Sequence, residues 1–343
     1  MRTIDYRVDL LRSGVRFGHL RFDASAPPTI YCDASAEIKL SLRGSFLPDD
    51  AADLLTDELQ PVCIVNGQEF PLGVFRAVTR RDVTDDAGTR WELEAYDRAV
   101  ALQQRKTEAR DSWPAGTSYD EIVLHYLQQA GIARVLLRPS GHVLQTSRED
   151  WDVGTSFLTI INDLLSEINY RALWFDLDGV AHAEPYAAPT ADSIAHRYGL
   201  HGRAAKLISP EFAVELDVWS KPNVFIAVLS NPELPPLTAT AVNDFPQSRL
   251  SVLRRGMRIP QVFKVANIAA DELQAYADRL RDEGMQTGEY VSVSSPIYPD
   301  HGVADVVALE LPELSGIFRE TRWSISMRAG DVMSHELERM VIV

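Results

Sequence analysis

The chain has 343 residues, 45% of them hydrophobic, and its 34 basic and 49 acidic side chains give a formal net charge of −15. This length and apolar content predict a globular protein of two to four modules, not a disordered one. The acidic balance excludes tight nucleic-acid binding, which needs clustered Lys and Arg to neutralise phosphates. No segment approaches the roughly 20 apolar residues of a membrane helix, and the N-terminus lacks the apolar core of a signal peptide. We therefore expect a soluble protein made in the cytoplasm.

Residues 1–105 are predicted to form a β domain. Apolar and polar residues alternate over 3–10 and again over 37–43, which is typical of strands with one wet face. The stretch 75–99 indicates a hairpin that turns at 84–88. Its return strand places Trp91, Leu93 and Ala95 inward, and Glu92 and Glu94 outward.

Residues 106–195 are predicted to form an α+β insertion that contains a duplicated unit. The segment 113–141 recurs as 151–179 at a constant offset of 38 residues, and two copies are too few for a solenoid. In each copy a Trp and a Gly-Thr-Ser segment precede a short apolar helix, and a strand-like run follows. Ser118 and Glu121 have the spacing of a capping box, and Gly131 is well placed to end the first helix.

Residues 196–343 are predicted to return to β structure, with one helix near 270–283. The residue pattern predicts strands at 212–219, 224–229 and 238–242. The last sixty residues are predicted to be β again, with side chains that alternate over 319–328. One face carries Arg319, Thr321, Trp323, Ile325 and Met327, and the other carries Glu320, Arg322, Ser324, Ser326 and Arg328. The Pro-rich loops at 230–249 and the apolar C-terminus are candidates for subunit or partner contacts, because extended and apolar segments commonly serve interfaces.

Few residues have the pattern of a catalytic or ligand-binding site, and we predict no catalytic, cofactor-binding or metal-binding residue. Common enzyme signatures such as a metalloprotease His-Glu-x-x-His helix or a Gly-x-Ser-x-Gly elbow are absent. His196 and His201 are five residues apart, and we interpret them as ordinary surface or core histidines because a metal site needs further ligands.

The remaining reactive side chains are also assigned structural roles. The doublets Asp49-Asp50 and Asp85-Asp86 lie in turn-like contexts, where Asp is favoured for local backbone hydrogen bonds. Cys32 and Cys63 lie in apolar surroundings and are predicted to be buried without a disulfide.

The duplicated unit admits two interpretations. Its Gly-Thr-Ser start followed by a short helix resembles the LysM module, and that resemblance implies binding of N-acetylglucosamine polymers through exposed aromatics such as Trp113 or Trp151. The structural interpretation, which we favour, is that Gly supplies the turn, Thr or Ser caps the helix and the Trp packs beneath it.

A second resemblance covers most of the chain. It is carried by Glu-Ala-Tyr-Asp-Arg-Ala at 94–99, by Trp-Pro-Ala-Gly-Thr-Ser-Tyr-Asp-Glu-Ile at 113–122 and by Ala-Gly-Ile at 130–132. The C-terminal half adds Pro222-Asn223-Val224, the Asn231-Pro232 to Pro236 loop, Arg254-Arg255-Gly256 leading to Pro260, the helix near 270–283, and Trp323 to Arg328 with Gly330 and Met333. Their order resembles that of the tail hub (baseplate hub) proteins of tailed bacteriophages and of phage-tail-like injection particles.

This resemblance implies a fold, a location and partners. The fold is mainly β, with β-barrel tube-like hub domains at 1–105 and 196–343 interrupted by the small LysM-like α+β module. The implied role is that of a minor tail protein, a structural component at the tail tip or baseplate of the virion. It would form a homotrimeric ring around the channel, adapt the sixfold tail to a threefold tip and act in genome ejection.

The implied partners are a distal tail or tail tube protein, a tape measure protein and central fibre or spike proteins. DNA is expected only as a passing, non-adherent cargo, and no stable membrane insertion, enzymatic activity or cofactor is expected. Strands with acidic outer faces, as at Glu92 and Glu94, suggest a conduit wall that repels phosphates. A cell-wall glycan-binding protein and a peptidoglycan-degrading protein remain the alternatives.

Overall fold

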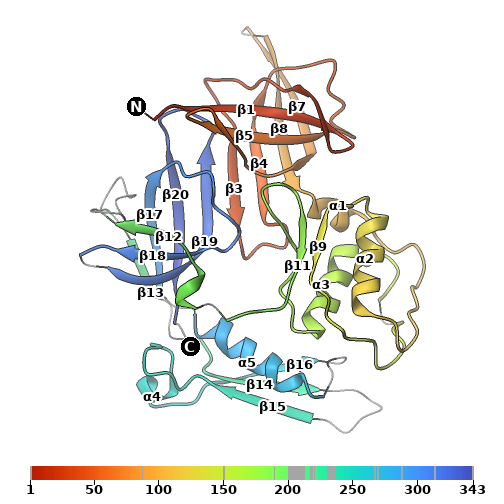
Figure 1. Cartoon of the computed structure of the whole chain (residues 1–343), viewed down its shortest axis with the longest axis vertical. Coiled ribbons are helices and arrows are strands. Elements are labelled where there is room, and N and C mark those ends of the chain that lie inside the picture. Colours follow the sequence, from red (N-terminus) through yellow and green to blue (C-terminus); the bar gives the residue numbers. More distant parts are fainter. Residues whose placement is uncertain are drawn as a thin grey trace.

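Figure 1 shows the computed structural model of the chain. The structure describes residues 2–86, 88–149, 151–188, 190–199, 213–216, 219, 221–229, 237–265, 268, 270–286, 289–312 and 314–341. Among these residues, no helix is both long and apolar enough to cross a membrane.

The described strands confirm a mainly β fold, and one large sheet dominates it. Its N-terminal strands are β1 (Ile4–Arg12), β2 (Val15–His19), β3 (Thr29–Asp33), β4 (Leu40–Phe46), β5 (Glu58–Val65), β6 (Gln68–Pro71), β7 (Phe75–Asp85) and β8 (Gly88–Asp97). Its C-terminal strands are β12 (Ile194–Gly199), β13 (Ala213–Leu216), β17 (Glu289–Pro296), β18 (Val306–Glu310), β19 (Ser315–Ser326) and β20 (Val332–Arg339).

The two halves of this sheet are joined edge to edge. Strand β19 pairs with β3, so that Trp323 lies opposite Cys32 across the junction. The path through the described strands runs β13-β17-β20-β19-β3-β4-β8-β7-β5-β1-β2 and has two ends. The prediction of closed barrels was therefore wrong: the halves share one sheet instead of each closing on itself.

The predicted N-terminal strands and hairpin are confirmed, with one local correction. Trp91, Leu93 and Ala95 are buried, and Cys32 and Cys63 are buried free thiols. Asp9, in contrast, was expected on the wet face of β1 but is buried. Its carboxylate is satisfied there by hydrogen bonds with the neighbouring Arg7 and His19 side chains, which lets an ionisable group sit at a largely covered position.

The insertion carries two helices at the 38-residue spacing of the predicted repeat. Helix α1 (Ala99–Gln104) precedes it, and its elements are α2 (Tyr119–Gln129), β9 (Val135–Leu137), α3 (Phe157–Glu167), β10 (Trp174–Phe175), β11 (Ala181–Ala183) and the 3-10 turn η1 (Ala191–Ser193). Helices α2 and α3 start 38 residues apart and pack together around one apolar core. Gly116 and Gly154 precede them with φ of +86° and +91°, a backbone that glycine adopts without steric cost.

The helix ends of the insertion test the predicted caps. The capping box at Ser118 was wrong, because that side chain makes no cap hydrogen bond. In the second copy Ser156 does cap its helix, by accepting from the Thr159 N–H at 3.1 Å. Gly131 follows the end of α2 with φ of +79°, as predicted.

A smaller α/β unit lies at the end of the molecule opposite the β7–β8 hairpin (Figure 1). It contains β14 (Val224–Leu229), β15 (Leu237–Val242), α4 (Val252–Arg255), β16 (Pro260–Val265) and α5 (Leu273–Gly284), in the sheet order β15-β14-β16. Helix α5 packs on β14 and β15, and Arg279 donates to the Tyr170 carbonyl at 2.9 Å, which ties this unit to the insertion.

The predicted strands at 224–229 and 238–242 and the helix near 270–283 are confirmed. Of the predicted strand at 212–219, residues 213–216 form β13. Of the predicted 230–249 loop, residues 230–236 lie outside the described residues and 237–242 belong to β15.

The predicted alternation over 319–328 is confirmed from Arg322 onward, where Trp323, Ile325 and Met327 are buried, and is wrong for residues 319–321. The register between β19 and β20 shifts between Glu320 and Arg322, which marks a β-bulge. Because a bulge adds a residue to one strand, it reverses which side chains face inward. Glu320 is consequently buried on the same side as Trp323, while Arg319 and Thr321 are partly exposed.

Candidate functional site

The bulge in β19 places Glu320 within a buried cluster of polar side chains in the C-terminal part of the large sheet. The cluster draws on β12, β17, β19, β20 and the loop between β17 and β18. Its members are His196 and Tyr198 from β12, Ser295 from β17, His301 and Asp305 from the loop, Glu320 from β19 and His335 from β20. We call these seven residues the histidine cluster.

Glu320 is the centre of the hydrogen-bond network. One carboxylate oxygen accepts from Nδ1 of His301 at 2.7 Å, and the other is paired with Nδ1 of His335. The opposite ring nitrogens are also occupied: Nε2 of His301 meets the Tyr198 hydroxyl, and Nε2 of His335 lies 2.7 Å from the Ser295 hydroxyl. Such a network satisfies polar groups that would otherwise be costly to bury.

The charge state of the network follows from this geometry. Burial alone would raise the pKa of Glu320, but the hydrogen bonds from His301 and His335 outweigh burial and hold that pKa below its ordinary value. Burial lowers the pKa of His335, because its environment disfavours the imidazolium form. A Glu320 carboxylate that accepts from a neutral His335 imidazole accounts for both directions.

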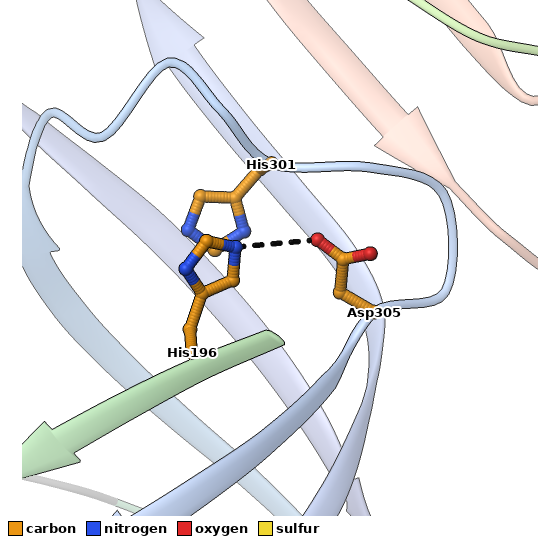
Figure 2. A group of neighbouring side chains, drawn as sticks. All are labelled: His196, His301 and Asp305. Carbon is orange, nitrogen blue, oxygen red and sulfur yellow. Dashed lines mark ion pairs between the residues drawn. The ribbon is translucent and has the colours of Figure 1, made fainter. Parts of the chain in front are cut away.

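Asp305 forms the second carboxylate of the cluster. It accepts from the Gly302 N–H at 2.7 Å, which closes the loop between them. Burial would raise the pKa of Asp305, yet the contacts with His196 and Gly302 hold it below the ordinary value. The His196 ring stacks on that of His301, with centroids 4.1 Å apart, and its Nε2 lies 3.3 Å from Asp305 Oδ2 (Figure 2).

Ser295, His335 and Glu320 are hydrogen-bonded in the order of a hydrolase triad. A nucleophile must, however, reach a substrate carbonyl, and Ser295 has a solvent exposure of 0%. Its hydroxyl also lies 2.8 Å from the Pro296 carbonyl. The arrangement is therefore suited to holding β17 against β20, and it lacks the access that acyl transfer requires.

The residues considered from sequence lie in different settings. His196 belongs to the histidine cluster, whereas His201 lies outside the described residues. Asp49 accepts from the Ala51 N–H at 2.9 Å in a turn, as predicted, and Asp85 is paired with Arg90 at the hairpin end. Asp49 and Asp85, one member of each doublet, are thus engaged locally.

The proposed glycan aromatics and the acidic hairpin face also have local partners. Trp151 is only 4% exposed and lies in the insertion core, with the Arg148 guanidinium 4.2 Å above its ring. Trp113 is half-buried and donates to the Tyr126 hydroxyl. Glu92 and Glu94 face outward as predicted, but Arg81 and Arg43 form ion pairs with them, so their charge is largely compensated.

The Glu-Ala-Tyr-Asp-Arg-Ala segment forms the junction between the N-terminal strands and the insertion. Asp97 is buried and accepts from the backbone N–H groups of Leu40 and Ala99. Next to it, Arg98 pairs with Glu58 and donates to the Gly179 carbonyl at 2.7 Å. These contacts connect β4, β5, β8, α1 and the β10–β11 turn.

A cavity of about 890 Å³ opens beside this junction, between β7, α1 and the insertion. Its lining contains cationic and anionic side chains together, including Arg76, Arg105, Glu108 and Asp111. The mixed charge gives the cavity no single preference for an anionic or cationic ligand.

No family model and no curated protein matches the sequence. Solved structures do match the fold over its full length. A tail protein of Neisseria meningitidis is 14% identical with a TM-score of 0.65, covering 98% of this chain and 97% of that one. The 43 kDa tail protein of prophage MuSo2 from Shewanella oneidensis is 9% identical with a TM-score of 0.65, covering 97% and 98%. The prophage tail protein gp18 of Listeria monocytogenes is 13% identical with a TM-score of 0.60, covering 97% and 94%. The chain therefore has the fold of phage tail proteins.

Proposed function

We propose that the chain is the tail hub of a phage or phage-tail-like injection particle. In this proposal it is a structural protein at the distal end of the tail tube, where three copies form a ring around the channel. The ring adapts the sixfold tail to a threefold tip, meets a distal tail or tail tube protein on one side and anchors a fibre or spike on the other. The role requires no turnover and no cofactor.

The observation that carries the proposal is the full-length match to tail proteins. A similarity limited to one β domain would be weak support, because folds are shared among unrelated functions. Here three tail proteins from different bacteria match both β regions, the insertion and the smaller α/β unit in one arrangement, with at least 94% of each chain covered. The order of sequence segments that resembles tail hubs supports the same assignment.

The ends of the large sheet suggest how copies would join. Strand β2 ends the path at one side and exposes Val15 and Phe17, which are 67% and 42% exposed, and β13 ends it at the other. Edge strands present unpaired backbone groups and are normally covered. A head-to-tail contact between the β2 end of one copy and the β13 end of the next closes into a ring when the rotation is threefold.

Light scattering of the purified protein tests the assembly. We expect a trimer of 38.3 kDa chains, and a lower mass for Phe17→Lys, because the lysine would place a charge in the contact. Leu55→Lys is the matched control, since Leu55 is also exposed but lies in a turn between β4 and β5. A stable dimer, or a Phe17→Lys variant that remains trimeric, would contradict the proposed ring.

The two alternatives make different predictions. Glycan binding through the duplicated unit now depends on Trp113, because Trp151 is buried, and it predicts that the protein co-sediments with peptidoglycan and that Trp113→Ala abolishes this. Peptidoglycan hydrolysis predicts turnover that is lost on a single Asp or Glu substitution. The hub proposal predicts neither result for the isolated chain.

A further inference from the structure

The histidine cluster contains a group whose hydrogen bonding is incomplete. Nε2 of His196 is buried and has no hydrogen-bond partner among the described residues. Asp305 Oδ2 is 3.3 Å away, but their relative orientation does not make a hydrogen bond. Asp305 Oδ2 already accepts from the Gly302 N–H, but buried polar atoms are almost always satisfied, so the His196 nitrogen calls for a further partner.

The separation of these two atoms fits a metal ion. Ligands about 2.1 Å from a tetrahedral zinc ion stand about 3.4 Å from each other. The 3.3 Å between His196 Nε2 and Asp305 Oδ2 matches such a pair of ligands. His301 supplies a third donor, since ligand atoms from all three residues lie within 4.8 Å of one another (Figure 2).

The surroundings of the three residues match those of metal ligands. His301 donates its Nδ1–H to Glu320, the carboxylate–histidine arrangement that commonly orients an imidazole toward zinc through its other nitrogen. Asp305 is held in place by the Gly302 N–H. The carboxylates of Asp305 and Glu320 each contact one of these imidazoles, and neighbouring carboxylates favour a cation there.

We propose that His196, His301 and Asp305 bind one divalent transition-metal ion of the zinc class. Two imidazole nitrogens and one carboxylate suit zinc or cobalt, whereas calcium and magnesium prefer six or more oxygen ligands. Binding turns one of the two stacked rings so that both nitrogens face the ion, and the ion replaces the Tyr198 hydroxyl as the partner of His301 Nε2. The ion would fasten β12 to the loop between β17 and β18.

The test uses the full chain without a histidine tag, stripped of metal with a chelator and then titrated with Zn²⁺. We expect one equivalent to bind per chain and the midpoint of thermal unfolding to rise, with no rise at the same concentration of Ca²⁺. In a separate titration, Co²⁺ should produce the visible absorption bands of a tetrahedral nitrogen and oxygen site. Absence of stoichiometric Zn²⁺ binding by the wild-type protein, or of those Co²⁺ bands, would overturn the proposal without any variant.

Variants assign the ligands. Asp305→Asn is nearly isosteric and His196→Gln removes the unpartnered nitrogen, so each should lose the bound equivalent and the rise in unfolding midpoint. His182→Gln is the matched control, because His182 also pairs with an aspartate, Asp176 at 2.8 Å, but lies in the insertion. Its binding should equal that of the wild type. Folded His196→Gln protein that still binds one equivalent would show that the ion lies elsewhere and would overturn the site.

Discussion

The buried carboxylate of Asp97 should make the free energy of unfolding depend on pH. Asp97 ends β8 and accepts from the N–H groups of Leu40 at 2.9 Å and Ala99 at 2.8 Å. Burial nevertheless raises its pKa from 3.8 to about 6, because desolvation of the anion outweighs the hydrogen bonds and the nearby charge of Lys39. The folded protein therefore binds this proton more tightly than the unfolded chain does.

The sign of the effect follows from proton linkage. Between pH 4 and 6 the folded state holds a proton that the unfolded state has released, so the free energy of unfolding falls as pH rises. A shift from 3.8 to about 6 corresponds to about 3 kcal/mol in total, at about 1.4 kcal/mol per pKa unit. About 2 kcal/mol of this is lost between pH 4.5 and 7.5.

Asp97→Asn removes the titration and tests the reasoning. The amide leaves one backbone N–H without an acceptor, at a cost of about 1–3 kcal/mol that does not vary with pH. Urea unfolding of wild type and variant at pH 4.5 and 7.5 should show the stability advantage of the wild type shrinking by about 2 kcal/mol at the higher pH.

Asp57→Asn serves as the control with the opposite sign. Its hydrogen bond from Arg12 holds the pKa of Asp57 below the ordinary value, so the stability it contributes is present at neutral pH and is lost as the pH falls. The advantage of the wild type over this variant should therefore be nearly constant between pH 4.5 and 7.5, which both lie above 3.8, and should shrink only below about pH 4. An Asp97→Asn difference that is constant or grows with pH would refute the argument.

Three further substitutions test the packing and the cluster. Trp151→Ala should cost about 3–5 kcal/mol in urea unfolding because the ring is in the insertion core; a loss below 1 kcal/mol would argue against that placement. Gly284→Ala should lower the free energy of unfolding by about 1–3 kcal/mol, because a Cβ there would overlap the Phe225 ring. Gly18→Ala is the control and should have little effect, because the nearest atom to its Cβ would lie 3.9 Å away. Equal midpoints of thermal unfolding for the two variants would contradict this. Ser295→Ala should lower the free energy of unfolding by about 1–3 kcal/mol, because it leaves His335 Nε2 buried without its hydrogen-bond partner. An unchanged free energy of unfolding in urea would show that the Ser295 hydroxyl does not stabilise the cluster.

Local patterns in the sequence predicted most of the elements. The two helices of the 38-residue repeat were predictable because each copy carries its own turn glycine and its own apolar stripe. The β7–β8 hairpin and helix α5 were predictable for the same reason. The capping box failed at Ser118 because side-chain spacing permits such a bond without requiring it.

Long-range features could not be predicted in this way. The continuous sheet depends on the pairing of β3 with β19, whose partners are some 290 residues apart in the chain, as Arg322 and Asp33 are. The histidine cluster was missed because its members come from five separate segments and because the bulge after Glu320 reverses the alternation on which the prediction relied. The one available signal was a set of histidines and acidic residues in otherwise apolar strands.

The most direct test of the proposed function is the position of the protein in the assembled particle. Purified tails labelled with antibody fragments against this chain can be imaged by electron microscopy. The proposal predicts label at the distal tip of the tail, with three fragments around its axis. Label along the length of the tube, or intact tails that carry none of the protein, would contradict it.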